Sequence, residues 1–299
     1  MTAIKTITTY KLDYMQSRPG ADFTDVESVI SSYNEFDKNG HSLVEITYMA
    51  NGIVEQRCEN KYNEKGLLVE EILINNDGEV DEKKAYEYNE MGVMIKEFLI
   101  YQDESYDTTE YHYDESGKLI EKITVDTDGE PESKKEISYL NDLITREAYF
   151  DADGNLLEEI KYKNDEKGNE IEVSRFTAED EKTIRTEYIY DENGVRTESL
   201  TYNRANELVA RNLYKEDEKG QLIEIIEQDQ FHKNTSLLNY DENGNMTEQS
   251  EYNEADVLSH RILRKFDESG NVVEVAITID RHGMGLNQNY MIQYKYEFF

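Results

Sequence analysis

The sequence predicts an all-β protein, an elongated antiparallel β-meander of about 20 strands whose double hairpins repeat about every 26 residues. The strands are expected to form a curved, superhelical single-layer sheet. Three observations support this fold class: glycines recur at regular intervals, strand-forming residues fill the intervals, and proline is rare. Apart from one double step, the main set of glycines is spaced 24 to 26 residues apart, at Gly40, Gly66, Gly92, Gly117, Gly168, Gly194, Gly220, Gly244 and Gly270. A weaker set falls between them, at Gly52, Gly78, Gly129, Gly154 and Gly283.

Each glycine of the main set closes a predicted hairpin turn, as the segment Asp191-Glu-Asn-Gly194 illustrates. The aspartate can accept hydrogen bonds from backbone amides ahead of it, and the glycine can take the left-handed conformation that ends the loop as a bulge. About 8 or 9 residues separate successive turns, which is a usual strand length. These intervals are rich in Tyr, Ile, Val, Thr and Leu, which strands favour. Proline occurs only at Pro19 and Pro131, as expected where most amides join a ladder.

The spacing also predicts which residues face one another across a hairpin. The residue four before the glycine should face the residue two after it, and the residue six before should face the residue four after. Tyr190 would then face Arg196, and Tyr188 would face Glu198. One face of the sheet is therefore expected to carry a tyrosine ladder flanked by glutamates. Such pairs stabilise a sheet, and the same face supplies the candidate partner-binding residues Tyr88, Tyr111, Tyr113, Tyr188, Tyr190, Tyr240, Glu121, Glu198 and Glu248.

Three segments are predicted: an N-terminal capping segment (1–35), the repeat array (36–284) and a C-terminal capping strand (285–299). Within the first, residues 22–33 fit either a short helix or a strand, and the strand is favoured. The last segment alternates aromatic and polar residues from Tyr290 to Phe298, as a strand does. A free ladder on this strand would be covered or would pair with another chain, so self-association is one expectation. The sequence leaves open whether the sheet stays open, spirals or closes.

The chain is strongly acidic, with 66 Asp and Glu residues against 32 Lys and Arg, a formal net charge of −34. Nucleic acid and anionic membranes should be repelled, whereas a basic protein should be attracted. No apolar run is long enough for a signal peptide or a transmembrane helix, so a cytoplasmic location is expected.

No motif predicts catalysis, a cofactor or a specific metal site. The five histidines are widely spaced, Cys58 is the only cysteine, and phosphate-binding glycine motifs are absent. Segments such as Asp151-Ala-Asp-Gly154 suggest calcium loops but lack the remaining oxygen ligands, and an ordinary hairpin turn explains them. We therefore expect a non-enzymatic protein, with weak cation binding to an acidic surface at most.

The pattern Tyr-x-Tyr-Asp-x-x-Gly, seen at Tyr188-Ile-Tyr-Asp-Glu-Asn-Gly194 and Tyr111-His-Tyr-Asp-Glu-Ser-Gly117, resembles the YD repeats of the Rhs family. The resemblance covers roughly residues 36–284. It implies long antiparallel sheets that spiral into a shell around a toxin or form adhesive stalks. The chain has fewer repeats than such a shell, and neither a self-cleaving region nor a toxin tip is visible.

These features predict a protein-binding repeat scaffold: an immunity protein, chaperone or adaptor that holds a basic effector, toxin or secretion-system component. The alternative is a carbohydrate- or cell-surface-binding module that stacks sugars on the tyrosine ladder. Binding that high salt abolishes would favour the first hypothesis, and salt-insensitive glycan binding would favour the second.

Overall fold

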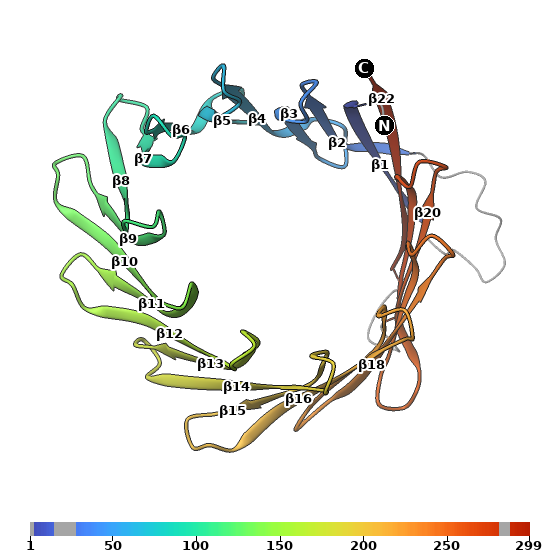
Figure 1. Ribbon diagram of the computed structural model, residues 1–299. Coiled ribbons are helices and arrows are strands. Elements are labelled where there is room, and N and C mark those ends of the chain that lie inside the picture. The colour runs from blue at the N-terminus through green and yellow to red at the C-terminus, as the bar shows by residue number, and fades with distance from the viewer. Residues whose placement is uncertain (1–2, 15–27, 281–287) are drawn as a thin grey trace.

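A computed structural model describes residues 3–14, 28–280 and 288–299, and these residues form one ring of antiparallel strands (Figure 1). Every strand pairs with the strand before it and the strand after it, and the first strand pairs with the last. The strands are β1 (Ile4–Tyr14), β2 (Val29–Phe36), β3 (Ser42–Tyr48), β4 (Val54–Tyr62), β5 (Leu68–Asn75), β6 (Val80–Tyr88), β7 (Met94–Ile100), β8 (Tyr106–Tyr113), β9 (Leu119–Val125), β10 (Pro131–Leu140), β11 (Leu143–Asp151), β12 (Leu156–Asn164), β13 (Glu170–Thr177), β14 (Lys182–Tyr190), β15 (Arg196–Tyr202), β16 (Leu208–Glu216), β17 (Leu222–Asp229), β18 (Lys233–Tyr240), β19 (Met246–Tyr252), β20 (Leu258–Phe266), β21 (Val272–Ile279) and β22 (Gln288–Phe298).

The sheet is a closed barrel of 22 strands, so the prediction of an open, superhelical sheet is wrong. Strands β1 and β22 pair along their whole length, from Ile4 opposite Phe298 to Tyr14 opposite Asn289. Closure satisfies the backbone groups that two free edge strands would expose. It requires a turn of about 16° per strand, which lies within the range that twisted sheets adopt. The repeat predicts that each strand is rotated relative to the one before it. A small difference in this angle of rotation decides whether the sheet forms a spiral or a ring.

The two terminal segments are part of the barrel wall. Strands β1 and β2 from the first 36 residues lie in the same sheet as the repeat strands. Residues 29–33 are in β2, as the strand interpretation expects, and Ser28 precedes the strand, whereas residues 22–27 lie outside the described residues. Strand β22 pairs with β21 on one side and with β1 on the other, so both of its ladders are occupied within the chain.

The turns have the predicted chemistry. Asp191 Oδ1 accepts hydrogen bonds from the amides of Asn193 and Val195, both at 2.9 Å. Gly194 has a φ of 82°, in the left-handed region that glycine tolerates best. Where glycine is missing, Asn or Asp often takes this conformation, as Asn206 does with a φ of 62°.

A second bulge changes the register beyond each turn of the main glycine set, and it corrects the predicted faces of the sheet. Tyr190 does lie opposite Arg196, but the register then shifts by one residue. Glu198 therefore pairs with Ile189, and Tyr188 pairs with Ser199. Because side chains alternate along a strand, Glu198 lies on the face opposite to that of the tyrosines. The predicted single face with both tyrosines and glutamates is wrong.

The winding of the chain determines which face lines the ring. When an L-residue strand runs upward with a side chain toward the viewer, the amide and carbonyl of that residue point right. The Asp191 amide donates to Val195 O, directly before β15, so the amide of Tyr190 points toward β13. Seen from the tyrosine side with the Gly194 turn uppermost, the chain therefore runs from right to left.

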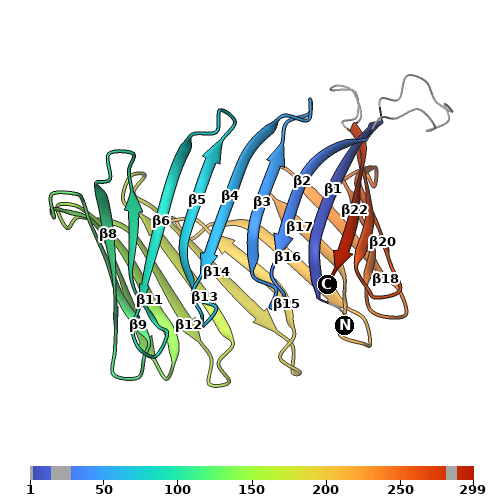
Figure 2. The same cartoon turned by 90° about the horizontal axis from the view of Figure 1, so that it is seen from above.

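The figures show that this view is from inside the ring. Even-numbered strands, including β14 and β22, run toward the rim where both ends of the chain lie, which we call the terminal rim (Figure 2). This rim faces the viewer in Figure 1, where the chain winds anticlockwise. From the centre of such a ring, with the terminal rim uppermost, the chain runs from right to left. The face that carries Tyr190 is therefore the inner wall, and the face that carries Glu198 is the outer wall.

The wall is one layer thick. Each strand contacts only its two neighbours. At ~4.8 Å between strands and a tilt of about 40°, the backbone ring is about 45 Å across, so side chains on opposite sides do not meet. Among the described residues, the buried hydrophobic side chains are Ile137, Ala148, Leu238 and Val275. Within the same part of the chain, no helix is long and apolar enough to cross a membrane.

Candidate functional site on the inner wall

Two columns of tyrosines stand on the inner wall. The first column, which includes the tyrosines found four residues before the glycine at several main turns, connects neighbouring hairpins. The Tyr88 hydroxyl donates to Leu68 O at 2.8 Å, and the Tyr190 hydroxyl donates to Glu170 O at 2.7 Å. The same bond is made by Tyr62, Tyr113, Tyr139, Tyr240 and Tyr296. In each case the acceptor lies two residues after the preceding turn, beside the second bulge. These hydroxyl groups connect each hairpin to a backbone carbonyl of the preceding hairpin, so they stabilise the wall.

The second column, six residues before the glycine, contacts charged side chains. Lys122 Nζ lies 4.6 Å from the centre of the Tyr111 ring, and the Arg196 guanidinium lies 4.1 Å from the centre of the Tyr188 ring. The Tyr111 hydroxyl also donates to Glu97 Oε2 at 2.7 Å. Burial raises the pKa of Tyr111, and the hydrogen bond to Glu97 raises it further. On the inner wall, basic side chains of the chain itself therefore already lie over tyrosine rings.

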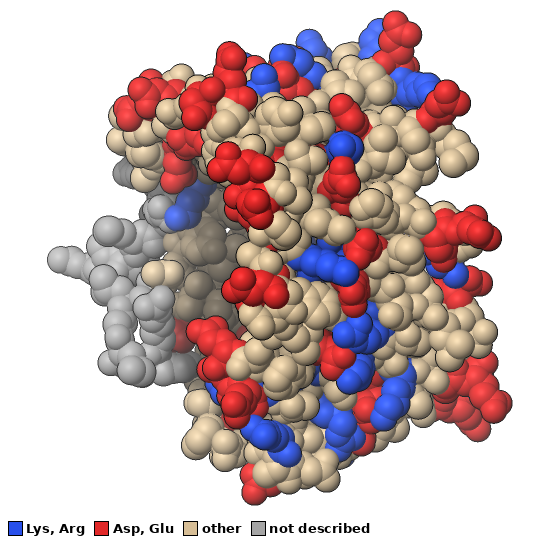
Figure 3. All heavy atoms as spheres, turned by 90° about the vertical axis from the view of Figure 1, so that its left-hand side faces the viewer, with Lys and Arg blue, Asp and Glu red and all other residues tan. Residues whose placement is uncertain are grey.

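The three predicted partner-binding glutamates lie on the outer wall, away from the six predicted tyrosines. Each forms an ion pair with a basic residue 13 positions later in the sequence. These are Glu121 with Lys134 at 2.8 Å, Glu198 with Arg211 at 2.6 Å, and Glu248 with Arg261 at 2.8 Å. Figure 3 shows the resulting outer surface over β8 to β11, where basic side chains lie beside acidic ones. This glutamate column is therefore largely neutralised.

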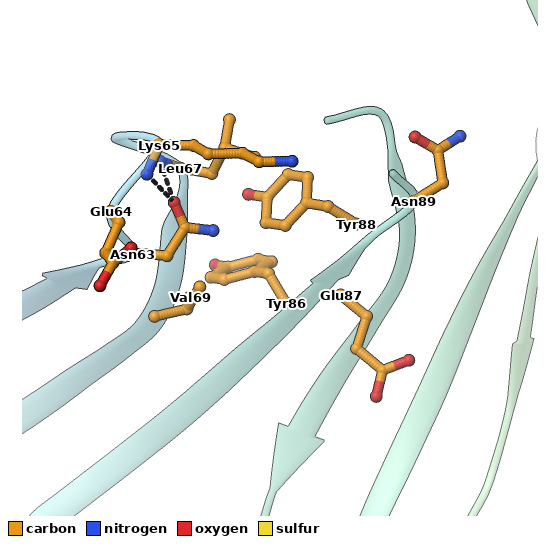
Figure 4. A pocket seen from close by; sticks show the side chains of 9 residues that line it. All are labelled: Asn63, Glu64, Lys65, Leu67, Val69, Tyr86, Glu87, Tyr88 and Asn89. Carbon is orange, nitrogen blue, oxygen red and sulfur yellow. Dashed lines mark hydrogen bonds between the residues drawn. The ribbon is translucent and has the colours of Figure 1, made fainter. Parts of the chain in front are cut away.

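A shallow pocket of about 600 Å³ opens under the terminal rim, between the turn after β4 and strand β6 (Figure 4). Its walls include Leu67 and Val69 from one repeat and Tyr86 and Tyr88 from the next. Lys65 extends along the pocket and donates to Glu90 O at 3.2 Å. The pocket combines apolar surface, aromatic rings and nearby carboxylates.

Groups capable of chemistry elsewhere are held in structural contacts. The Cys58 thiol has its pKa raised to about 11 by burial and by Glu71, so it is protonated at neutral pH. His41 Nδ1 lies 2.8 Å from Asp37 Oδ2, and its ring stacks on Tyr62. No cluster of three or more His, Cys, Asp or Glu residues that could hold a metal occurs in the described part of the chain.

The sequence reasoning missed Glu71 and Glu97 on the inner wall and did not select Tyr86. In the register found, Tyr86 lies opposite Glu97, whereas Tyr111 lies opposite Lys122. The residue five after each glycine, not four, faces this tyrosine column. Comparing the residue five after the glycine from repeat to repeat would show that Glu97 replaces Lys122. This comparison requires that the position of the second bulge be known.

A family model described as a MORN repeat variant matches residues 106–126 and 146–164, which are a small part of the chain. No curated protein matches. With the internal repeat, this match supports a repeat protein.

Similar solved structures include the TcdB2-TccC3-Cdc42 complex, at 10% identity and a TM-score of 0.45, where the similarity covers 92% of this chain and 19% of the other. This chain thus spans about a fifth of that one. A porin-like protein from Bacteroides uniformis is similar at 9% identity and a TM-score of 0.32, covering 99% and 98% of the two chains. A porin-like protein from Bacteroides vulgatus has 11% identity and a TM-score of 0.24, covering 99% of each chain.

Proposed function

We propose that the barrel is a non-enzymatic protein-binding scaffold that holds a basic partner against its inner wall. The observation that carries this proposal is a set of inner-wall carboxylates without basic partners. The three predicted outer glutamates have ion-pair partners within the chain. On the inner wall, Glu82 and Glu147 pair with Lys84 and Lys135. Four other inner-wall glutamates have no basic partner within 4 Å among the described residues: Glu71, Glu97, Glu227 and Glu251.

A protein is the favoured class of partner because a concave wall of this width offers a large surface. The net charge of −34 attracts a basic protein and repels nucleic acid. The resemblance of Tyr188–Val195 to YD repeats favours an effector or toxin context. In that context the chain would serve as an immunity protein, chaperone or adaptor in the cytoplasm, and kinship with the Rhs family is part of this proposal.

A labelled peptide of alternating arginine and serine tests the proposal against its alternating glutamate–serine counterpart. We expect the intact barrel to bind the basic peptide at about 50 mM salt and to lose most of this binding at about 300 mM, because salt screens exposed charges. Fluorescence anisotropy measures both. No binding of the basic peptide, or equal binding of both peptides, would contradict the proposal. Salt-insensitive binding to a glycan array would support the carbohydrate-binding alternative.

A pair of charge-matched variants locates the binding. The inner-wall variant carries Glu71→Gln, Glu97→Gln, Glu227→Gln and Glu251→Gln. The control carries four substitutions of solvent-exposed turn residues, Glu115→Gln, Glu192→Gln, Glu242→Gln and Glu268→Gln, and has the same net charge. Weaker peptide binding in the inner-wall variant alone is expected. Equal weakening in both would mean that only the overall charge matters.

A further inference from the structure

Equivalent tyrosines of the inner wall differ in whether the chain supplies their cation. In β8 and β9, Tyr111 lies opposite Lys122, whose ammonium covers the ring at 4.6 Å. In β14 and β15, Arg196 covers Tyr188 at 4.1 Å. The cation arrives from the following strand in both repeats. A ring face at this position is therefore suited to bind a cation.

The repeat of β6 and β7 has the opposite charge at this place. Tyr86 lies opposite Glu97, the register position that Lys122 fills in the next repeat. Glu71 lies on the preceding strand, β5, where it is opposite Lys84 in the backbone register. Neither Glu71 nor Glu97 has an ion-pair partner within 4 Å among the described residues, and no described cation covers the Tyr86 ring.

Two lysines lie near the site, and neither covers the ring. Lys65 lines the pocket but donates to Glu90 O at 3.2 Å. Lys84 Nζ is 2.8 Å from Glu82 Oε1 on its own strand, and the pKa of Lys84 is raised by this hydrogen bond and, less strongly, by the charges of Glu97 and Glu71. The pKa of Tyr86 is raised by burial and then by the charges of Glu71 and Glu97, which indicates a locally negative environment.

The ring of Tyr86 borders the pocket under the terminal rim, where Figure 4 shows it beside Tyr88 and Val69. Among the equivalent tyrosines, Tyr162 and Tyr214 also have no described cation over the ring. The Tyr162 hydroxyl donates to Glu147, which pairs with Lys135, whereas the Tyr214 hydroxyl contacts Ser199 and Asn212. Tyr86 thus combines a ring that no described cation covers, an open pocket, and two nearby carboxylates that form no ion pair within 4 Å among the described residues, although Glu97 accepts a hydrogen bond from Tyr111.

We propose that the pocket at Tyr86 binds an arginine or lysine side chain of a partner protein, in the position that Lys122 occupies at Tyr111. Glu71 and Glu97 neutralise the incoming charge, and Leu67 and Val69 contact its aliphatic stem. This inference rests on the proposed function, since it names the place where a basic partner is gripped.

The test measures peptide binding by anisotropy with the intact barrel and single variants. We expect Tyr86→Leu to weaken binding of the arginine–serine peptide about five- to twentyfold, and Tyr86→Phe to change it less than about twofold. Tyr188→Leu is the matched control, because that ring is already covered by Arg196 and has no hydrogen bond to Glu71 or Glu97, and its effect should be small. Equal affinities for wild type and Tyr86→Leu would overturn the site, as would equal losses in Tyr86→Leu and Tyr188→Leu.

A second variant keeps the inference testable if Tyr86→Leu does not fold. Glu97→Lys places an internal cation in the register of Lys122 and should block the site, whereas Glu192→Lys makes the same charge change in an exposed turn. We expect a loss of at least about tenfold in Glu97→Lys and a smaller loss in Glu192→Lys. Equal losses would overturn the site. A lysine–serine peptide shows which cation is preferred. If the wild-type barrel binds neither peptide, the proposed function fails; if it binds both and no variant at Tyr86 or Glu97 matters, only the site fails.

Discussion

The inner and outer walls are built from the same repeat but are stabilised by different interactions. The inner wall uses tyrosine hydroxyls that donate to backbone carbonyls of the neighbouring repeat. The outer wall uses ion pairs between strands, such as Glu198 with Arg211. One bulge per hairpin separates these two sets of side chains onto opposite faces. The alternation of side chains along a strand therefore does not by itself determine which residues a surface carries, because the bulge also matters.

The largest expected difference between the walls is their response to alkaline pH. Burial raises the pKa of Tyr86, Tyr111 and Tyr162 above the ordinary value near 10, and nearby carboxylates raise it further. The folded state favours the protonated phenols, so their stabilisation is fully present below about pH 10 and is lost as the pH rises above it. We expect cooperative unfolding between about pH 10 and 12, followed by circular dichroism and tyrosinate absorbance. Tyrosine ionisation without loss of strand signal would contradict this role.

A smaller, local effect is expected from removal of one inner-wall tie. Tyr190→Phe deletes the hydroxyl that donates to Glu170 O and should lower the free energy of unfolding by about 1 kcal/mol. Tyr190→Leu also removes ring packing and should cost about 2 to 3 kcal/mol. Urea unfolding measures both. The matched control is Tyr202→Phe on the outer wall, where the ring lies under Arg185 and the hydroxyl makes no hydrogen bond to a described residue. Equal costs for the two Phe variants would show that the tie is unimportant.

The smallest effect is expected from an outer-wall ion pair. Glu198→Gln removes the carboxylate that pairs with Arg211, whose side chain is 48% exposed. Since partly exposed pairs contribute little, the free energy of unfolding should fall by less than about 1 kcal/mol, and the difference should shrink in high salt. A double-mutant cycle with Arg211→Gln isolates the pair. A coupling above that of the Tyr190 tie would reverse the ranking of the two walls.

The sequence predicts the strands and turns well because their causes are local. The Asp191 carboxylate and the left-handed Gly194 define a hairpin within a few residues of each other. Asn141 and Asp142 replace the missing glycine between Gly117 and Gly168, and both have positive φ values.

The remaining features depend on contacts that no single repeat contains. The bulge after Arg196 depends on how two strands fit together, so the face of Glu198 was predicted wrongly. Closure of β1 on β22 depends on an angle accumulated over all strands. The site at Tyr86 was missed for the same reason, because Glu97 comes opposite it only in the shifted register.

The extra residue in each bulge makes the two surfaces tolerant of a one-residue deletion at that place. Tyr190 lies opposite Arg196 and Ile189 lies opposite Glu198, so Thr197 has no partner of its own in the ladder. Deleting Thr197 would restore plain alternation in β15 and would leave Glu198 on the exterior. Loss of one residue, normally regarded as damaging inside a strand, would here keep the lining and the exterior as they are.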